Sequence, residues 1–304
     1  MSILHAKVIV NPVAGARTTY RKWARISSLL KHVGLSFDYE YTESVGHAVE
    51  LARLAASDVY RYIVSVGGDG TANEVANGIL HSTHPSETSL GIVNTGTGRD
   101  FARSLGLPQD YASACAVLNS SNRRLVDVGI VKFNCNGQSQ QRFFINMAGV
   151  GFDAAAVETT EKLPKHLGGT IPYLTGLLLT MLRYKNKTVV INMDDRIVTK
   201  RVLNVVIANG SYVGGGMHVA PQAKLNDSLL DVVTIGDIGK FELLKALPMV
   251  YKGTHVNHPR VSIEQVKNIA IESSERLQVY ADGELLGECP ASFSLKPAAL
   301  SIVV

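Results

Sequence analysis

The chain has 304 residues, 46% of them hydrophobic and 18% charged, so it is long enough for two domains and too apolar for a disordered protein. Its net charge is only +4 and is spread evenly, which excludes the basic footprint of a nucleic-acid-binding protein. Three scattered cysteines, no secretory signal and no apolar run of about 20 residues favour a cytoplasmic protein without a transmembrane helix.

The first 127 residues alternate between apolar runs and amphipathic segments. Strands are expected at 7–10, 37–41, 62–66 and 90–93, and helices at 20–33, 48–55, 72–80 and 101–105. Strands that alternate with helices are typical of a parallel sheet covered by helices on both faces. This part of the chain is therefore predicted to be a three-layer α/β domain.

After residue 127 the pattern changes to short β-type runs separated by turn signals. Strands are expected at 125–133, 143–147, 188–193, 198–208, 229–235, 269–272 and 277–280. This part is predicted to be an antiparallel sandwich or barrel, with helical inserts near 153–184 and 239–251. The segments 293–296 and 300–304 also resemble strands, but composition does not decide to which domain they return.

One glycine-rich loop lies between an expected strand and an expected helix. Its residues are Gly67, Gly68, Asp69, Gly70 and Thr71. A strand, a glycine turn and a helix in this order direct backbone N–H groups at one point, which suits a phosphate. A carboxylate inside such a loop is expected where a divalent cation accompanies the phosphates. The loop therefore predicts a nucleoside triphosphate bound with Mg²⁺.

Two further loops follow the first and fourth strands, and Thr42 follows the second. They consist of Asn11, Pro12, Val13, Ala14 and Gly15, and of Asn94, Thr95, Gly96, Thr97 and Gly98. The carboxyl ends of parallel strands meet at one edge, where ligands bind. A single glycine loop can be explained as a tight turn without a ligand. This explanation is weaker for three such loops on one edge of the sheet. A GxxxxGK[ST] loop is absent, and GxGxxG would need glycine at position 73, which is Asn73.

In their order and spacing, these loops resemble the diacylglycerol-kinase-type lipid kinases. That superfamily includes sphingosine kinases and is more distantly related to NAD kinases and phosphofructokinases. The resemblance covers nearly the whole chain and rests on the following motifs: Asn11-Pro12-x-x-Gly15, Gly67-Gly68-Asp69-Gly70-Thr71-x-Asn73-Glu74, Gly96-Thr97-Gly98-x-Asp100, Gly149-x-Gly151-Phe152-Asp153, Leu230-Asp231-Val232 and Asp282-Gly283-Glu284.

The resemblance implies a fold and a division of the chain. Residues 1–127 and 291–304 would form a nucleotide-binding α/β domain like that of NAD kinase and phosphofructokinase. Residues 128–290 would form an antiparallel β-sandwich-type domain that binds the lipid, and ATP would lie in the cleft between the two domains. The return of 291–304 to the first domain is expected from the resemblance only.

The resemblance also implies roles for individual residues. The residues expected to hold ATP are Asn11, Pro12, Val13, Ala14, Gly15, Thr42, Gly67, Gly68, Asp69, Gly70, Thr71, Asn73, Glu74 and Thr97. Asp69 would organise the Mg²⁺ of the nucleotide, with Asp100 as a second carboxylate. Asp227, with Lys224 and the Leu229 carbonyl, would hold a structural Mg²⁺. Without the resemblance, Asn226-Asp227-Ser228 is typical of a capped turn.

The general base of the family lies in the motif that matches Asp282 and Glu284. A carboxylate there would accept the proton of the lipid hydroxyl. The spacing alone favours a hairpin turn, since Asp-Gly between two β-type runs is a common hairpin signal. The sequence does not decide which of the two carboxylates is the base.

Several positions depart from the family or permit two interpretations. Arg99 stands where the family usually has Asn, Asn94 stands where it usually has Pro, and Ser228 stands where it usually has Gly. Arg99 is expected to contact a phosphate or the lipid headgroup. The apolar segment 171–182 has the spacing of a core-facing stripe, which we favour over membrane contact. The histidines of 255–259 are expected in a surface loop and not at a metal.

The sequence thus predicts a cytoplasmic, ATP- and Mg²⁺-dependent lipid kinase. It would phosphorylate diacylglycerol to phosphatidic acid, for phospholipid biosynthesis, in peripheral contact with the membrane that holds the substrate, and the resemblance leaves a homodimer open. The alternatives are a kinase of another alcohol, such as a sphingoid lipid or NAD, and a catalytically silent nucleotide- or lipid-binding protein. The sequence contains no residue pattern that identifies the acceptor.

Overall fold

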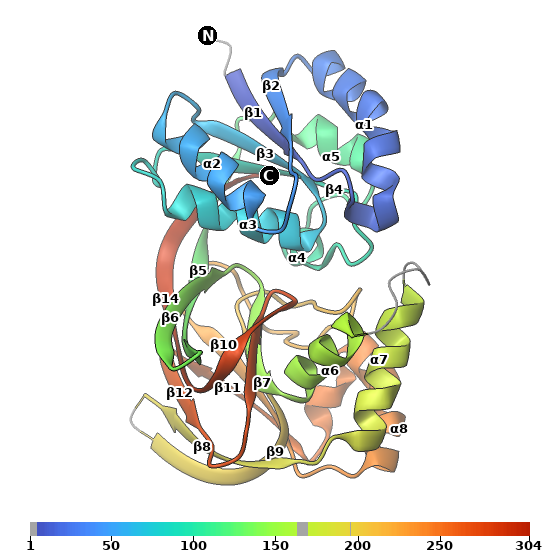
Figure 1. Cartoon of the computed structure of the whole chain (residues 1–304), viewed down its shortest axis with the longest axis vertical. Helices are drawn as coiled ribbons and strands as arrows, with labels where there is room; N and C mark the ends of the chain where they lie inside the picture. Colours follow the sequence, from blue (N-terminus) through green and yellow to red (C-terminus); the bar gives the residue numbers. More distant parts are fainter. Residues whose placement is uncertain (1–4, 163–169, 195) are drawn as a thin grey trace. The chain divides into compact units, whose positions relative to one another are not determined.

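The computed structural model describes residues 5–162, 170–194 and 196–304. The chain divides into two compact units, which we describe separately (Figure 1). Unit 1 comprises Met1–Val128 and Pro297–Val304, and unit 2 comprises Gly129–Lys296. Two long strands, β5 (Arg123–Cys135) and β14 (Glu284–Val303), each contribute residues to both units.

Unit 1 is built on a parallel sheet. Its strands are β1 (His5–Val10), β2 (Ser36–Tyr41), β3 (Tyr62–Gly67) and β4 (Ser89–Asn94), and the end of β14 is added in parallel beside β4. The order is β2-β1-β3-β4-β14. Nearly every residue of β3 and β4 is buried, as expected for strands covered on both faces.

Helices cover both faces of this sheet. The helices α1 (Ala14–His32) and α5 (Tyr111–Val117) share one buried cluster with the sheet, to which α1 contributes Trp23, Ile26 and Leu30. The helices α2 (His47–Ser57) and α3 (Asp69–Leu80) pack together on the opposite face (Figure 1). The short helix α4 (Asp100–Ser104) follows β4. The predicted three-layer α/β architecture is confirmed.

The first turn of α1 departs from regular helix. Gly15, Ala16 and Arg17 have φ values of 59°, 55° and 66°, in the left-handed region that non-glycine residues rarely adopt. This explains why periodicity indicated a helix only from residue 20. At Gly15 a Cβ atom would lie 2.4 Å from the Thr95 carbonyl oxygen, so this position requires glycine for space as well as for φ.

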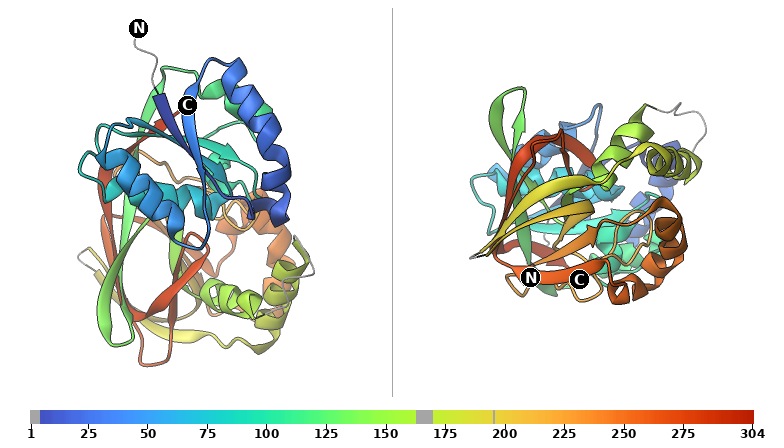
Figure 2. Two further views of the ribbon diagram at one scale, coloured as in Figure 1. Left: turned by 45° about the horizontal axis from the view of Figure 1, so that its top comes forward. Right: turned by 90° about the horizontal axis from the view of Figure 1, so that it is seen from below.

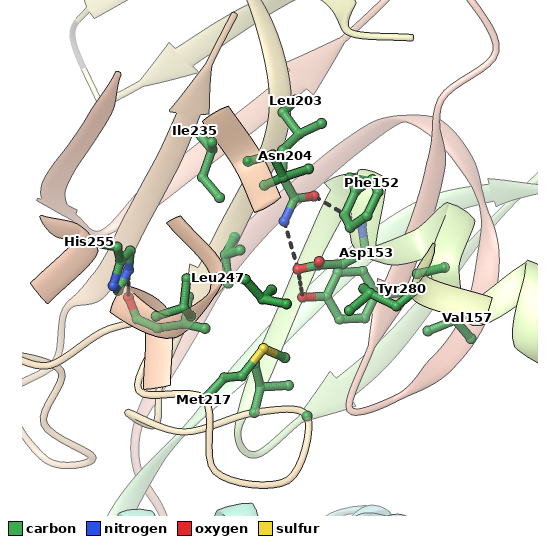
Figure 3. A pocket seen from close by; sticks show the side chains of 18 of the residues that line it. Phe152, Asp153, Val157, Leu203, Asn204, Met217, Ile235, Leu247, His255 and Tyr280 are labelled. Atoms are coloured by element: carbon green, nitrogen blue, oxygen red, sulfur yellow. Dashed lines mark hydrogen bonds between the residues drawn. The ribbon is translucent and has the colours of Figure 1, made fainter. Parts of the chain in front are cut away.

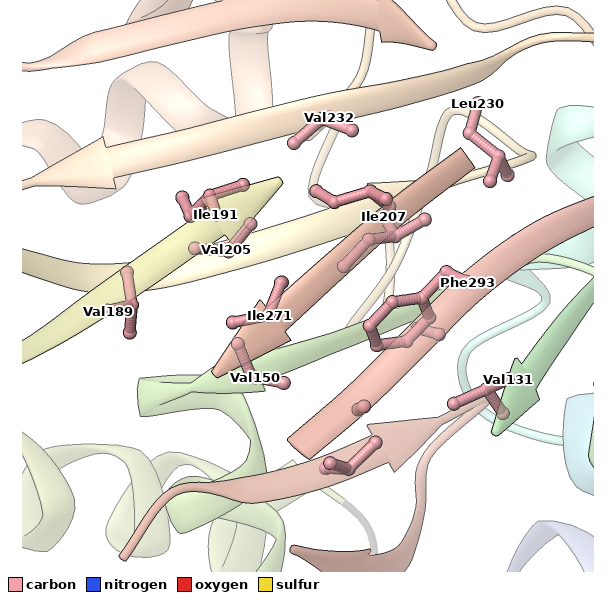
Figure 4. Close-up of a cluster of buried hydrophobic side chains, with 14 of the residues drawn as sticks. Val131, Val150, Val189, Ile191, Val205, Ile207, Leu230, Val232, Ile271 and Phe293 are labelled. Carbon is pink, nitrogen blue, oxygen red and sulfur yellow. The ribbon is translucent and has the colours of Figure 1, made fainter. Parts of the chain in front are cut away.

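Unit 2 is mainly antiparallel. Besides parts of β5 and β14, its strands are β6 (Gln138–Phe144), β7 (Met147–Gly151), β8 (Lys187–Met193), β9 (Arg196–Ala208), β10 (Leu230–Gly236), β11 (Val261–Val266), β12 (Asn268–Glu272) and β13 (Gln278–Ala281). The pairings β9-β7-β13-β14-β12-β8 return to β9 and so close a ring. Alternate side chains point inward and fill it, among them Val150, Ile191, Val205 and Phe293 (Figure 4).

In the described part of unit 2, three α-helices and a short 3₁₀ helix complete the fold. These are α6 (Phe152–Glu161), α7 (Thr170–Arg183), α8 (Lys240–Lys252) and η2 (Thr254–Asn257). Both further views place α6, α7 and α8 on the same side of the unit (Figure 2). Among the described residues, no helix is both long and apolar enough to cross a membrane.

The segment 171–182 lies in α7 and is only partly buried. Leu177 is buried and Met181 packs against the same cluster, whereas Leu178 and Leu182 are exposed. The side chains of 171–174 are outside the described residues. The favoured interpretation of a core-facing stripe therefore accounts for one face of α7 but not for the other.

The strands differ from the sequence prediction in several ways, one of which is that β11 (Val261–Val266) was not expected. The expected strand 143–147 is the end of β6 and the start of β7, since the chain turns at Ile145 and Asn146 to contact Asp282. The tail, expected as two short segments, belongs to one long strand that begins at Glu284. Pro290 and Pro297 interrupt its apolar pattern and hide its continuity in the sequence.

Candidate functional site

Backbone hydrogen bonds bring together the loops at the carboxyl ends of β1, β3 and β4. The N–H groups of Thr95 and Gly96 donate to the Gly67 carbonyl at 2.7 and 3.2 Å. The Asn11 side-chain amide donates to the Thr71 hydroxyl at 3.0 Å. The three loops predicted from the sequence therefore form one surface of unit 1.

The backbones of two of these loops approach each other closely. A Cβ atom on Gly96 would lie 2.7 Å from the Cα of Gly68, a separation that only glycine permits. Gly70, in the first turn of α3, has nothing within 4 Å of the position of a Cβ. The close contact holds the loops together, and the space beside Gly70 leaves the start of α3 open to an anion.

Asp69 and Asp100 converge beside this surface. A Cβ atom on Gly98 would lie 2.9 Å from Oδ2 of Asp69 and 3.1 Å from Oδ2 of Asp100. The other oxygen of Asp69 accepts hydrogen bonds from the Asn94 amide and the Phe101 N–H, at 3.2 and 3.1 Å. Two carboxylate oxygens around one point are the donors that Mg²⁺ prefers, so the residues fit a phosphate-bound metal ion.

The other predicted nucleotide ligands differ in how open they are. Thr97 and Val13 are exposed, whereas Thr42 and Thr71 are buried. The oxygens of Asn73 accept hydrogen bonds from the Asn77 amide. Glu74 accepts the Ala48 N–H at 3.2 Å and thereby caps the start of α2. The contacts of Asn73 and Glu74 stabilise the scaffold under the loops.

Arg99 lies in the third loop with a left-handed φ of 58°. Its guanidinium donates to the carbonyl oxygens of Gly96 and Gln109. These contacts position the loop, and they account for an arginine at this point without a phosphate or a lipid headgroup.

In unit 2, Asp282 is held by a nest of backbone donors. Its two carboxylate oxygens accept the N–H groups of Ile145, Asn146 and Met147 at 2.7, 3.1 and 2.9 Å. The residue has a φ of 46°, as the hairpin-turn interpretation of Asp-Gly requires. Because both oxygens already accept N–H groups, protonation of Asp282 would cost hydrogen bonds that fix the turn between β6 and β7.

Glu284 is half-buried, as Asp282 is, but it contacts a cationic side chain. One of its oxygens accepts from the Arg142 guanidinium at 2.7 Å, and both side chains keep about a third of their surface exposed, at 31% each. The ion pair orients the carboxylate and leaves part of it accessible. Of the two predicted catalytic carboxylates, Glu284 has the geometry that suits a proton acceptor.

The predicted structural metal loop is a tight turn. Oδ1 of Asp227 accepts the Leu229 N–H at 3.1 Å, as in a capped turn. Ser228 has a φ of 62°, a left-handed conformation that glycine adopts more readily than serine. Lys224 is exposed and Leu229 half-buried. Within the described ranges, no group of three or more His, Cys, Asp and Glu side chains surrounds a metal position, so an ion here would depend on carbonyl oxygens as well.

Asp231 is a buried carboxylate near this loop. It belongs to the Leu230-Asp231-Val232 motif, but no role was predicted for it. Its Oδ2 has no hydrogen-bond partner in the part of the chain that the structure describes. Burial raises the pKa of Asp231 to about 6, and the Asp227 carboxylate adds to this effect. An unpartnered buried oxygen beside Asp227 fits a cation at this loop.

Behind α6, α7 and α8 lies a largely apolar cavity of about 170 Å³ (Figure 3). Its walls include Phe152, Leu203, Met217 and Leu247. The sequence did not predict this cavity, because its lining comes from segments far apart in the chain.

One polar cluster faces the cavity. Oδ2 of Asp153 accepts from the Asn204 amide at 2.6 Å and from the Tyr280 hydroxyl at 3.2 Å (Figure 3). Burial raises the pKa of Asp153, and these two hydrogen bonds only partly oppose that effect. The environment therefore favours the neutral carboxyl.

His255 also borders the cavity, which corrects the expectation of a surface loop. It lies in η2, is buried, and contacts the Val219 carbonyl through Nε2 at 3.0 Å. Burial lowers its pKa. Asn257 and Pro259 of the same segment are exposed, so the expectation of a surface loop fails for His255 and not for the whole segment. Local polarity did not indicate that His255 would border the cavity, because this is a long-range contact.

The chain matches two family models. Residues 5–131 match the diacylglycerol kinase catalytic domain, and residues 146–304 match the YegS C-terminal NAD kinase beta sandwich-like domain. Two solved structures from Bacillus anthracis strain Sterne share the fold over all of this chain. The first is 25% identical in sequence, with a TM-score of 0.82, and the match covers 96% of its chain. The second, a diacylglycerol kinase, is 23% identical, with a TM-score of 0.74, and the match covers 97% of its chain.

Curated relatives agree with these matches. A diacylglycerol kinase of Staphylococcus saprophyticus is 31% identical over 289 residues, which are 95% of this chain and 91% of that protein. A diacylglycerol kinase of Bacillus subtilis is 30% identical over 291 residues, which are 95% of this chain and 92% of that protein. With both family models and these relatives extending over nearly its whole length, the chain belongs to the diacylglycerol-kinase-type lipid kinase family.

Proposed function

We propose that the protein transfers the γ-phosphate of ATP, with Mg²⁺, to the free hydroxyl of diacylglycerol and so forms phosphatidic acid. Unit 1 supplies the nucleotide site and unit 2 the acceptor site. The observation that carries the choice of a lipid acceptor is the largely apolar cavity of unit 2, in which Asp153, Asn204 and Tyr280 form one polar cluster and His255 lies apart from it (Figure 3).

The nucleotide end of the proposal rests on the joined loops of unit 1. The start of α3 offers N–H groups beside the open space at Gly70, and the Thr97 hydroxyl is exposed. Asp69 and Asp100 would hold Mg²⁺, which neutralises charge on the phosphates when bound. In phosphoryl transfer the protein contributes mainly position and electrostatics, and these loops supply both.

We assign the proton acceptor to Glu284 and a supporting role to Asp282. Asp282 fixes the turn at 145–147 through three backbone N–H groups, whereas Glu284 pairs with the Arg142 side chain and is 31% exposed. Glu284 would accept the hydroxyl proton of the lipid as the oxygen attacks the γ-phosphate. Asp227, with the Lys224 and Leu229 carbonyls, would hold a second, structural Mg²⁺ that also satisfies the buried Asp231.

The cavity favours an uncharged acylglycerol over the alternative acceptors. A dry cavity of about 150 Å³ admits benzene, so 170 Å³ holds part of an acyl chain. A neutral Asp153 carboxyl can donate to an ester carbonyl, whereas a sphingoid amine would require the ionised form. NAD would bring phosphates and ribose hydroxyls into a lining that has few polar groups to receive them.

Phosphate transfer from radiolabelled ATP to diacylglycerol, sphingosine and NAD tests this function. Labelled phosphatidic acid as the main product, with loss of activity in EDTA, supports the proposal. Label only in NAD or only in sphingosine would overturn the acceptor. No transfer to any acceptor, in a protein that still binds ATP, would favour the catalytically silent alternative.

A further inference from the structure

The outer side of α8 has an unusual composition for a surface helix. Its exposed residues include one stripe that recurs every three or four positions: Phe241, Leu244, Lys245, Pro248, Tyr251 and Lys252; Lys240 and Glu242 of the first turn are exposed as well. Phe241 is 71% exposed, and Leu244 and Tyr251 are nearly half exposed. Large apolar side chains and lysines thus alternate on the face that points away from the core.

The end of α7 continues this stripe. Leu178 and Leu182, one turn apart, are exposed, and Leu182 is 62% exposed. The Lys240 ammonium donates to the Leu182 carbonyl, so the last turn of α7 meets the first turn of α8. We call the exposed side chains of these two helices the α7–α8 outer face; its members are Leu178, Leu182, Phe241, Leu244, Lys245, Tyr251 and Lys252.

The charge of the outer face is positive. Lys245 lies over the Phe241 ring, with Nζ 4.6 Å from the ring centroid. Lys252 and Arg183 lie at the ends of the two helices. The acidic residue of α8, Glu242, is engaged by His258, with Nε2 and Oε1 3.2 Å apart. Exposed apolar groups beside cationic side chains are typical of helices that lie in the headgroup region of an anionic bilayer.

The inner sides of the same helices form a wall of the cavity. Leu177 of α7 and Leu243, Leu247 and Val250 of α8 line it. The outer face therefore lies one helix thickness from the proposed acyl-chain site. A lipid leaving a bilayer on which α7 and α8 rest would reach the cavity without crossing water, an advantage that a protein partner at this face would not provide.

From this arrangement we propose that the α7–α8 outer face docks the protein on an anionic lipid bilayer. The apolar side chains enter the interface, and the lysines contact the anionic headgroups. The proposal deepens the proposed lipid-kinase function by naming the surface through which the enzyme reaches its substrate. The docking itself requires neither ATP nor catalysis.

Sedimentation with vesicles tests the docking in the absence of ATP. The full chain should bind vesicles of phosphatidylcholine with phosphatidylglycerol more tightly than vesicles of phosphatidylcholine alone. Leu182→Ser with Phe241→Ser should weaken binding about tenfold or more, and Lys245→Gln about fivefold. Ile197→Ser is the matched control, because Ile197 is a 67% exposed apolar residue of β9; it should bind as the unaltered chain does.

Activity on a water-soluble dihexanoylglycerol separates docking from catalysis. Both outer-face variants should phosphorylate it within about twofold of the unaltered chain, because the soluble substrate needs no docking, while their activity on vesicle-borne diacylglycerol falls with their binding. If no lipid is phosphorylated by any form, the lipid-kinase function fails, and vesicle binding still decides the docking.

Three outcomes would overturn the docking proposal. In the first, the unaltered chain binds neither kind of vesicle. In the second, Leu182→Ser with Phe241→Ser binds as tightly as the control variant. In the third, the unaltered chain is a dimer in solution and these substitutions convert it to a monomer, which would assign the face to a second copy of the chain.

Discussion

Asp69 and Asp100 direct their Oδ2 atoms at one point, which a Cβ on Gly98 would approach to 2.9 and 3.1 Å. Asp69 comes from the start of α3 and Asp100 from the start of α4, so the pair forms only when the loops after β3 and β4 are in register. Asp100 is restrained further by Arg103, at 2.9 Å. The two carboxylates therefore differ: Asp69 is oriented through Oδ1 by two neutral donors, whereas Asp100 is held by an ion pair.

Removing the Asp69 charge should affect catalysis far more than folding. We expect Asp69→Asn to lower kcat by about 10²–10³-fold and to raise the Mg²⁺ concentration needed for half-maximal activity. Asp100→Asn should have a smaller effect, because Arg103 already compensates its charge. Steady-state kinetics with a Mg²⁺ titration measures both, and Asp58→Asn, at an exposed carboxylate of unit 1, is the control. Full activity of Asp69→Asn at low Mg²⁺ would contradict the assignment.

Two glycines of the nucleotide loops should respond in opposite ways to alanine. Gly96→Ala introduces a Cβ 2.7 Å from the Gly68 Cα and should destabilise unit 1 by about 1–3 kcal/mol. Gly70→Ala has room in the structure and favours helix, so stability should stay equal or rise by up to about 1 kcal/mol. Its methyl group would occupy the proposed phosphate space and weaken ATP binding. Denaturant unfolding and ATP titration of both variants check this pair.

Asp282 and Glu284 should separate stability from chemistry. Asp282→Asn places an amide among three backbone N–H donors and should cost about 1–3 kcal/mol of unfolding free energy. Glu284→Gln should keep the melting temperature within a degree or two and lower kcat by about 10²–10⁴-fold. Melting curves and single-turnover phosphorylation distinguish them. A stable, inactive Asp282→Asn beside an active Glu284→Gln would reverse the assignment.

Mg²⁺ should stabilise unit 2 without nucleotide. An ion present at about 100 times its Kd adds about 2.7 kcal/mol, which corresponds to a melting-temperature rise of about 5 °C. EDTA should remove this gain, and Asp227→Ala should remove the response to Mg²⁺. Asp194→Ala is a comparison in another loop of the unit, where the carboxylate receives the Lys267 and Asn268 N–H groups; it should still respond to Mg²⁺.

The buried Asp153 should make stability depend on pH. Its pKa is raised in the folded state, so the folded protein holds the proton at pH values where the unfolded chain has lost it. The carboxyl therefore contributes most below its unfolded pKa, and stability falls as pH rises through the folded value. Asp153→Asn keeps an acceptor for Asn204 without the charge. As pH rises above the unfolded pKa of aspartate, the variant should therefore gain stability relative to the unaltered chain, measured by denaturant unfolding.

The sequence predicted unit 1 well because the relevant signals are local. A buried strand, a glycine turn and a helix start lie within a few residues around Asp69, and the same pattern recurs after β1 and β4. Their meeting at one edge follows from parallel pairing alone. The side-chain partners were not predictable in this way. Glu74 accepts the N–H of Ala48 and so caps the start of α2, although the two residues are far apart in the sequence.

In unit 2 the sequence predicted the class of fold and candidate site residues, but not their long-range partners or the cavity. The donors to Asp282 come from 145–147, more than a hundred residues earlier, and no local pattern links the two segments. The cavity is similarly assembled from α6, α7, α8 and several strands. The exposed side of α8 was not predicted, because Leu, Tyr and Phe residues in a helix are typical of core positions. Only the structure shows that these side chains face solvent.

Because the last part of β14 belongs to unit 1, unit 1 can complete its fold only after unit 2 has been synthesised. Leu300, Ile302 and Val303 are buried in unit 1, and β14 there pairs with β4. While the ribosome is still producing unit 2, the nascent first unit has an uncovered sheet edge at β4 and lacks these side chains. Such an edge invites association with other chains, so the polypeptide depends on rapid completion or on chaperone protection until translation reaches its final strand.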